Sequence, residues 1–268
     1  MKDKKVLCVS SEVIPYLPET EMARMSFDTA RMVHKEGGQT RIFMPRFGLI
    51  NERRHQLHEV IRLSGMNMII NDMDMPLIIK VASIPKERMQ VYFIDNDEYF
   101  KRKATFSDDD GKLFDDNDER MIFFAKGVVE TVKKLNWAPD IIHVHGWMAS
   151  LLPIYLKEYY KDDALFADSK IVTSIYNNDF GGTLNKELAN KIGFDKVENT
   201  DSIKEPNHHN LQKIAIENSD AIITGSEDIS SELIDYAKSL DKPVLEFYPE
   251  DDFKDAYLEF YQTKVLQE

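Results

Sequence analysis

Four short polar segments contain side chains that could bind a ligand or transfer a proton, and each directly follows an apolar run. Such a run predicts a strand that is buried on both faces, as in a parallel sheet. Open parallel sheets bind ligands beyond the carboxyl ends of their strands. The segments that we expect at this edge are 10–21, 145–148, 176–182 and 225–228.

His143 and His145 lie two residues apart in a predicted strand, so their side chains share one face of the sheet. An imidazole titrates near neutral pH and can exchange protons or ligate a metal. A metal site would need a third convergent ligand, which the sequence does not show, and we predict no metal. His145 is a candidate for a polar role at the edge of a pocket.

The segments around Trp147 and Tyr176 offer groups suited to a sugar. The flat face of Trp147 could stack on a sugar ring, or it could pack behind the sheet where a helix begins. Tyr176, Asn177 and Asn178 place several hydrogen-bonding groups at a strand end. The glycines at 181–182 would permit either close approach of a ligand or a tight turn.

The first polar segment is poorly suited to a diphosphate. Backbone N–H groups reach a phosphate where glycines leave room, and a lysine commonly assists. Here the loop contains Pro18, Glu19, Thr20 and Glu21, with two carboxylates and no glycine. We expect weak phosphate binding, with Thr20 capping the following helix and Pro18 stiffening the turn.

Several enzyme classes lack their key residues. Neither GxGxxG nor GxxxxGK[ST] occurs, so no dinucleotide or P-loop cofactor is predicted. No GxSxG elbow occurs, and the single thiol, Cys8, lies in an apolar run, which disfavours a triad hydrolase. The aspartates at 108–110 and 115–116 are expected in a solvated loop over 106–119.

The elements that must position these groups alternate along the chain. Strands are predicted at 6–9, 40–44, 60–70, 75–84, 89–95, 140–145, 170–175, 221–224 and 244–247. Helices are predicted at 22–35, 119–135, 149–160, 210–218, 228–239 and 252–266. His208 and His209 precede one of these helices and are expected to be exposed capping residues.

This order predicts an α/β fold with a Rossmann-like, doubly wound, mostly parallel sheet and an antiparallel excursion in the middle. We find no internal repeat or low-complexity linker, and we expect one domain over residues 1–268 that ends in the helix at 252–266.

The composition of the chain limits the classes of partner and the cellular compartment that we expect. The chain has 268 residues, 43% of them hydrophobic, which is enough for a packed core. Its net charge of −13 disfavours nucleic acid and anionic membranes. No apolar run is long enough to span a membrane or to act as a signal peptide, and a single cysteine fits a reducing compartment. We expect a cytoplasmic protein.

Several stretches are similar, in the same order, to those of bacterial glycogen synthases and plant starch synthases. They are Lys5–Pro15, Arg41–Arg46, Gln90–Asp95, Asp140–Trp147, Leu151–Leu156 and Ser219–Thr224. The resemblance implies the amino-terminal domain of a two-domain GT-B glucosyltransferase, which moves glucose from ADP-glucose, or UDP-glucose in some relatives, to an α-1,4-glucan. The second domain of such enzymes holds most of the nucleotide. Beyond the resemblance we expect only one short strand and one helix.

The resemblance also implies a set of site positions. They are Glu12, Pro18, Glu19, Thr20, Glu21, Arg24, His145, Trp147, Tyr176, Asn177 and Asn178. The family's diphosphate loop, Lys-Thr-Gly-Gly-Leu, falls on residues 18–22, and a following acidic residue falls on Arg24. A positive charge is therefore lost and two negative charges are added.

The other two family motifs are also changed. His-Asp-Trp-His falls on 145–148, where Gly146 and Met148 replace the aspartate and the second histidine. Thr-Val-His-Asn falls on 174–177, so Tyr176 replaces the histidine that contacts the transferred sugar. Losing one such contact typically costs about 2 to 4 kcal/mol of transition-state stabilisation.

Three hypotheses follow. We favour a glycogen or starch synthase-like domain that is catalytically incompetent alone and acts as a glucan-binding or regulatory protein. The alternative is an active half of an ADP-glucose-dependent α-1,4-glucan synthase, completed by a second glycosyltransferase chain. The third is a different small-molecule enzyme whose polar pocket is lined by Glu12, Glu19, His145, Tyr176 and Asn178. Expected partners are an α-1,4-glucan or a sugar nucleotide, and whether the chain is an enzyme stays open.

Overall fold

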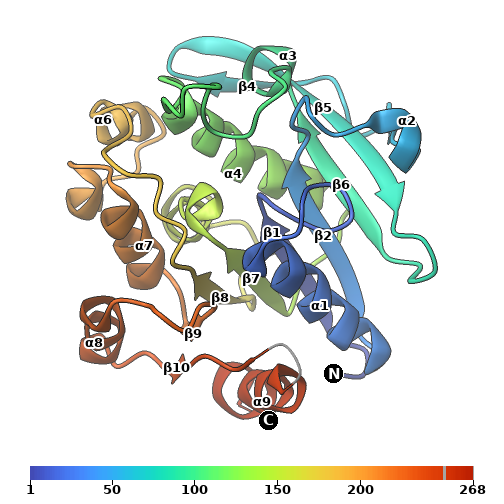
Figure 1. Cartoon of the computed structure of the whole chain (residues 1–268), viewed down its shortest axis with the longest axis vertical. Helices are drawn as coiled ribbons and strands as arrows, with labels where there is room; N and C mark the ends of the chain where they lie inside the picture. Colours follow the sequence, from blue (N-terminus) through green and yellow to red (C-terminus); the bar gives the residue numbers. More distant parts are fainter. Residues whose placement is uncertain (250–251, 268) are drawn as a thin grey trace.

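The computed structural model describes residues 1–249 and 252–267. A central sheet has helices on both faces (Figure 1). Its strands are β1 (Lys5–Ser10), β2 (Gln39–Pro45), β3 (His58–Glu59), β4 (Met66–Ile70), β5 (Met73–Ser83), β6 (Gln90–Asp95), β7 (Ile141–His145), β8 (Lys170–Ile175), β9 (Ala221–Thr224) and β10 (Val244–Leu245). The predicted α/β fold class, with a doubly wound and mostly parallel sheet, is confirmed.

The parallel part of the sheet has the order β10-β9-β8-β7-β1-β2-β6. From β1 the chain winds outward through β2 to β6 on one side and, later, from β7 to β10 on the other. The strand order therefore reverses between β1 and β7, and a ligand crevice in such sheets lies beyond the carboxyl ends at this point.

The predicted antiparallel excursion is present, with one correction. β5 pairs antiparallel with β6, β3 and β4. Of the strand expected over 60–70, only residues 66–70 form a strand, which is β4, because a turn at residues 61–63 follows β3. At this turn the Ser64 hydroxyl accepts a hydrogen bond from the Ile79 N–H, and Gly65 has a φ of +83°. The local backbone therefore cannot continue the pleated ladder through 61–65.

The long helices lie close to their expected positions, and the differences concern short helices. The helices are α1 (Glu21–Lys35), α2 (Glu52–His55), α3 (Asp97–Phe100), α4 (Asn117–Lys134), α5 (Leu152–Ile154), α6 (Leu188–Gly193), α7 (His208–Glu217), α8 (Ser231–Ser239) and α9 (Phe253–Phe260), with the helical turns η1 (Trp147–Ala149), η2 (Tyr155–Tyr159), η3 (Asp201–Ile203) and η4 (Tyr261–Val265). The helix expected over 149–160 is irregular, since η1, α5 and the π-helical η2 follow one another. Short helices such as α6 show too few turns for a periodic signal.

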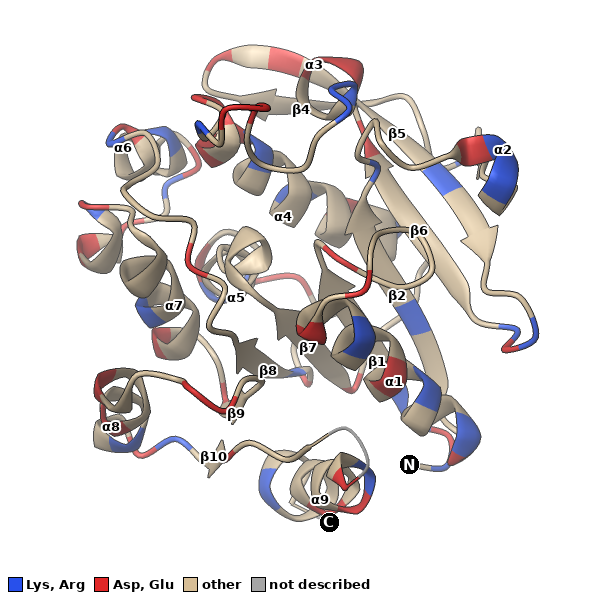
Figure 2. Ribbon diagram, in the orientation of Figure 1, with Lys and Arg blue, Asp and Glu red and all other residues tan. Residues whose placement is uncertain are grey.

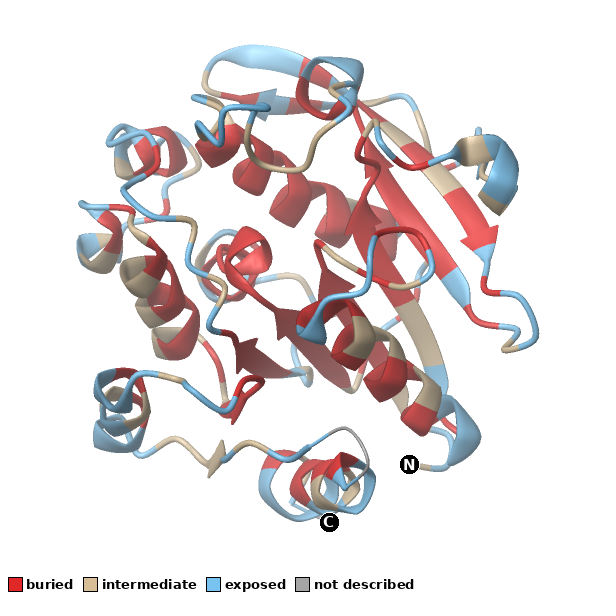
Figure 3. Ribbon diagram, viewed as in Figure 1, coloured by how far each residue is buried: buried red, intermediate tan, exposed pale blue. Residues whose placement is uncertain are grey.

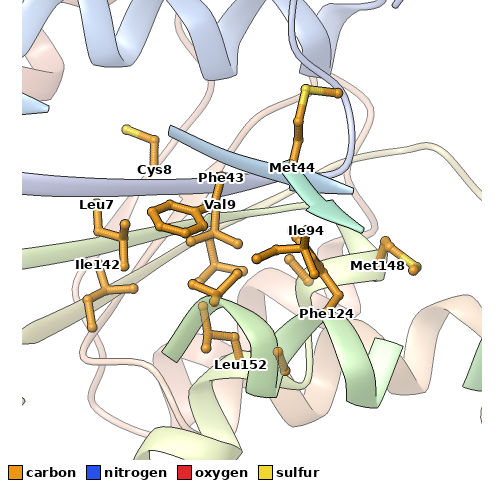
Figure 4. Close-up of a cluster of buried hydrophobic side chains, with 14 of the residues drawn as sticks. Leu7, Cys8, Val9, Phe43, Met44, Ile94, Phe124, Ile142, Met148 and Leu152 are labelled. Atoms are coloured by element: carbon orange, nitrogen blue, oxygen red, sulfur yellow. The ribbon is translucent and has the colours of Figure 1, made fainter. Parts of the chain in front are cut away.

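The core lies on both faces of the sheet. Figure 4 shows Leu7, Val9 and Ile142 pointing toward the helices that carry Phe124 and Leu152, which are α4 and α5, whereas Cys8 points to the opposite face. On that opposite face α9 contacts α1. The strands β1, β7 and β8 are buried along almost their whole length (Figure 3), and Cys8 is fully buried as expected. None of the helices in the described ranges is long and apolar enough to cross a membrane.

Candidate functional site

The polar segments after β1, β7, β8 and β9 meet at one edge of the sheet, as the sequence predicts. The register aligns Ser10 with His145 and His145 with Ser174 across three neighbouring strands. The edge therefore brings together Glu12, His145 and Tyr176 from separate parts of the chain. Acidic positions cluster around the amino end of α1 beside this edge (Figure 2).

Tyr176 and His145 form the centre of this edge. The Tyr176 hydroxyl lies 2.8 Å from Nδ1 of His145, and both side chains are buried. Among the described residues, Nε2 of His145 has no hydrogen-bond partner. Burial lowers the pKa of His145 to about 3, and burial raises the pKa of the Tyr176 hydroxyl. Both groups are therefore neutral at physiological pH.

His143 and His145 do share a face, and their rings lie 4.0 Å apart between centroids. Nδ1 of His143 is 2.5 Å from the Tyr261 hydroxyl, and Nε2 is 2.7 Å from the Ser174 hydroxyl. Burial, with the neighbouring His145 as a lesser cause, lowers the pKa of His143 well below its usual value. Among residues 1–249 and 252–267, no three His, Cys, Asp or Glu side chains converge as a metal site would require.

The Tyr176 ring occupies the space above Gly225, at the end of β9. A Cβ at position 225 would lie 2.4 Å from the ring, so only glycine permits this contact. The Tyr176 carbonyl accepts a hydrogen bond from Gln212 of α7 at 3.2 Å. The Tyr176 side chain is thus packed between the ends of β7 and β9 and does not project into solvent.

The first polar segment makes its hydrogen bonds within the chain. The Thr20 hydroxyl caps α1 by accepting the Ala23 N–H at 3.0 Å, which confirms its predicted role, and it donates to Glu12 at 2.6 Å. Glu21 accepts a hydrogen bond from the Ser226 hydroxyl at 2.5 Å. Burial raises the pKa of Glu12, and the bond from Thr20 opposes that shift.

Residues 18–20 of this segment are exposed. Glu19 forms an ion pair with Arg24, so the one cation among the predicted site positions is compensated locally. Pro18 is exposed and lies between the turn at residues 14–16 and α1. A shallow cavity of about 280 Å³ lies beside these residues and is lined by Glu19, Thr20, Glu21, Arg24, Met25, Phe247 and Tyr248. Its carboxylates outnumber its single arginine, which disfavours a diphosphate.

Gly146 and Met22 close the space between β7 and α1. Gly146 has φ 73° and ψ 173°, a conformation that is essentially restricted to glycine. A Cβ at this position would lie 2.3 Å from Sδ of Met22. The same sulfur is 3.9 Å from Nδ2 of Asn178. A thioether therefore lies where an acidic side chain from position 146 would have to be placed.

The structure decides between the two interpretations of Trp147. Its side chain is 2% exposed and its ring centroid lies 4.7 Å from that of Phe106 and 4.8 Å from that of Phe180. Trp147 packs behind the sheet and has no free face for a sugar. Asn177 is exposed, and its N–H donates to the Ser226 hydroxyl at 3.2 Å.

The expectation that His208 is an exposed capping residue is wrong. His208 is buried, and Asn207 caps α7 by accepting the Asn210 N–H at 2.8 Å. Nε2 of His208 lies 3.1 Å from Oδ1 of Asn178, and burial lowers the pKa of His208. The loop after β8 folds back over α7 and covers the imidazole, which the sequence around His208 does not reveal.

The sequence interpretation also missed Tyr257 and Tyr261. Both are buried against the histidine pair, and their ring centroids lie 6.4 Å and 5.9 Å from that of His143. They are four residues apart on the last helical segment, so they share one face of it. That spacing in the sequence indicates that the two tyrosines share a helical face, but it does not indicate which part of the sheet this face covers.

Comparison with known proteins gives a family and a fold. Residues 5–244 match the family described as starch synthase catalytic domain. The chain is 35% identical over 231 residues to a glycogen synthase of Chlorobium limicola, covering 86% of this chain and 47% of that protein. It is 41% identical over 177 residues to a glycogen synthase of Chlorobium phaeobacteroides, covering 65% of this chain and 36% of that protein.

A solved structure agrees at the level of the fold. It is the catalytic domain of starch synthase IV from Arabidopsis thaliana bound to ADP and acarbose, with a TM-score of 0.72 at 16% identity. The match covers 92% of this chain and 51% of that one. The chain thus spans about half the length of the relatives that it matches.

Proposed function

The chain belongs to the starch synthase catalytic domain family and is a glycogen or starch synthase-like glycosyltransferase domain; on this premise we propose that its candidate site does not transfer glucose. We propose further that the chain acts as a glucan-binding or regulatory protein in storage-polysaccharide metabolism. The observation that carries the proposal is the position of Tyr176, whose hydroxyl is bonded to His145 and whose ring fills the space above Gly225.

The sugar side of the site supports this proposal. The resemblance assigns sugar contact to a histidine at position 176, and here a buried tyrosine faces inward at that position. The His145 imidazole and the Tyr176 phenol are both held neutral by burial, so neither is a general acid or base near pH 7. Neither side chain would therefore supply a charge or a mobile proton to a transition state at this position.

The donor side supports it as well. A diphosphate at the amino end of α1 would approach Glu19 and Glu21, and Arg24 is already paired with Glu19. Like charges at close range raise the free energy of such a complex. A glucan carries no charge and therefore meets no such electrostatic penalty from an acidic surface.

Titration calorimetry with ADP-glucose, ADP and maltoheptaose tests the proposal. We expect heat only from maltoheptaose, and no labelled glucose incorporated into glycogen from ADP-glucose. Micromolar binding of either nucleotide would overturn the proposal in favour of an active half-enzyme completed by a second chain. Binding of none of the three ligands would overturn it in favour of a different small-molecule protein on the same fold.

A further inference from the structure

A large cavity lies away from the candidate site. It has a volume of about 790 Å³, within the range typical of ligand sites, and lies where α4 contacts β4, α6 and η2. Its lining includes Ile69, Lys126, Tyr159, Lys191 and Phe194. None of the lining residues belongs to the predicted site positions, so this is a separate feature of the surface.

The cavity collects exposed apolar side chains. Ile69, Phe194 and Tyr159 are 61%, 60% and 44% exposed, and all three line it. Isolated exposed hydrophobic residues are common, but several around one hollow mark a binding site. The Tyr159 ring is held in place, since Nζ of Lys126 lies 5.2 Å from its centroid and the Tyr160 ring packs edge-on at 4.7 Å.

The floor of the cavity is polar, and its two buried cations are paired with carboxylates. Nζ of Lys126 donates to Asp195 at 2.6 Å and to the Ile69 carbonyl at 2.9 Å, and the Tyr155 hydroxyl donates to Asp195 at 2.7 Å. Nζ of Lys191 lies 2.6 Å from Asp118 and 2.8 Å from Glu119. The buried cations are thus fully engaged by carboxylates and are not free to bind an anion.

The rim has charges of both signs. Asp72, Asp162, Lys161 and Lys196 all line the cavity and are exposed. A ligand with strong charge of either sign would meet repulsion somewhere on this rim. Aromatic faces beside hydrogen-bonding groups instead suit a pyranose, which presents C–H bonds on its faces and hydroxyl groups around its edge.

We propose that this cavity is an α-glucan-binding site, with Phe194 and Tyr159 as stacking platforms for sugar rings. The proposal rests on the glucan-binding function proposed above and assigns that binding to a place away from the sheet edge. Because the cavity and the candidate site are separate, the chain could bind a glucan in the cavity while the candidate site stays empty.

The test is titration calorimetry of the full chain with maltoheptaose, comparing wild type with Phe194→Ala and Tyr159→Ala. We expect each substitution to weaken binding roughly tenfold, because one stacking surface is lost. Phe194→Tyr should bind as wild type does. Leu240→Ala is the matched control, since Leu240 is 40% exposed but does not line the cavity.

Two further readouts keep the outcomes separate. Binding should change less than about twofold between low and high salt, because the ligand is neutral. If wild type binds maltoheptaose but neither alanine substitution weakens it, the assignment to this cavity is wrong and the proposed function stands. If wild type binds neither maltoheptaose nor glycogen, the glucan-binding function itself fails, and that result precedes any variant.

Discussion

Nδ1 of His145, at the end of β7, lies 2.8 Å from the hydroxyl of Tyr176, directly after β8. This contact joins two neighbouring strands at the edge where the sheet would receive a ligand. The Tyr176 ring continues to Gly225 after β9, so one side chain spans three strand ends.

The Tyr176 ring fills the space above Gly225. We expect Gly225→Ala to lower the free energy of unfolding by about 2 kcal/mol through overpacking against the ring. Tyr176→Ala should lower it by about 3 kcal/mol by leaving a cavity. In the double variant the new methyl group fills part of that cavity, so the combined loss should fall short of the sum by at least about 1 kcal/mol. Urea unfolding monitored by circular dichroism measures all four proteins, and additive losses would contradict the contact.

Restoring the histidine of the family at position 176 should not restore synthesis. Tyr176→His leaves the carboxylates Glu19 and Glu21 at the amino end of α1 and leaves Met22 against Gly146. We therefore expect no incorporation of labelled glucose from ADP-glucose into glycogen, with Tyr176→Phe as the matched control. Measurable elongation by Tyr176→His alone would show that the rest of the site is competent.

Introducing an aspartate at position 146 should destabilise the chain. Gly146→Asp forces a side chain into a conformation restricted to glycine and into the Met22 sulfur, and we expect a loss of about 3 kcal/mol in the free energy of unfolding. Gly193→Ala is the control, because a Cβ there meets no atom within 4 Å. Equal unfolding midpoints for wild type and Gly146→Asp would show that the loop after β7 can rearrange freely.

The stability of the fold should decrease as the pH falls below about 6.5, the pKa of an unperturbed histidine. Burial lowers the pKa of His145 to about 3 and places that of His143 well below its usual value. The unfolded chain therefore binds protons that the folded chain cannot bind. Each histidine contributes its full stabilisation at pH values above its pKa in the unfolded chain. As the pH falls from that value towards the pKa in the folded chain, the free energy of unfolding decreases by up to about 1.4 kcal/mol per pH unit for each histidine.

Urea unfolding at pH 7.5, 6.0 and 5.0 measures this slope, in a range above the titration of ordinary carboxylates. His145→Asn should reduce the slope by the equivalent of up to one bound proton, because it removes one imidazole whose pKa is lowered by burial. An unchanged slope in that variant would mean that His145 titrates normally in the folded chain.

Much of the fold could be predicted from the sequence because burial is encoded locally. The apolar run before Ser10 indicates a strand covered on both faces, and β1 has this burial pattern. Thr20 before an apolar helical repeat indicates a helix start, and its hydroxyl caps α1. The expected polar segments meet at one edge because parallel strands all end there.

The same local signals failed where a contact depends on how distant elements dock. His208 follows a capping position in the sequence and is nonetheless buried by the loop that carries Asn178. The cavity beside α4 combines residues of β4, η2 and α6, none of which has a pattern that points to the others.

The sequence by itself determined the order of strands and helices, the positions of the polar segments and the charges that they carry, because periodicity and residue type are properties of short stretches. Only the tertiary structure decided what fills the site. Tyr261 reaches His143 across 118 positions of sequence, and Tyr176 reaches His145 across 31. Such contacts follow from the packing of η4 and of neighbouring strands. Close packing lets a single ring exclude any other occupant.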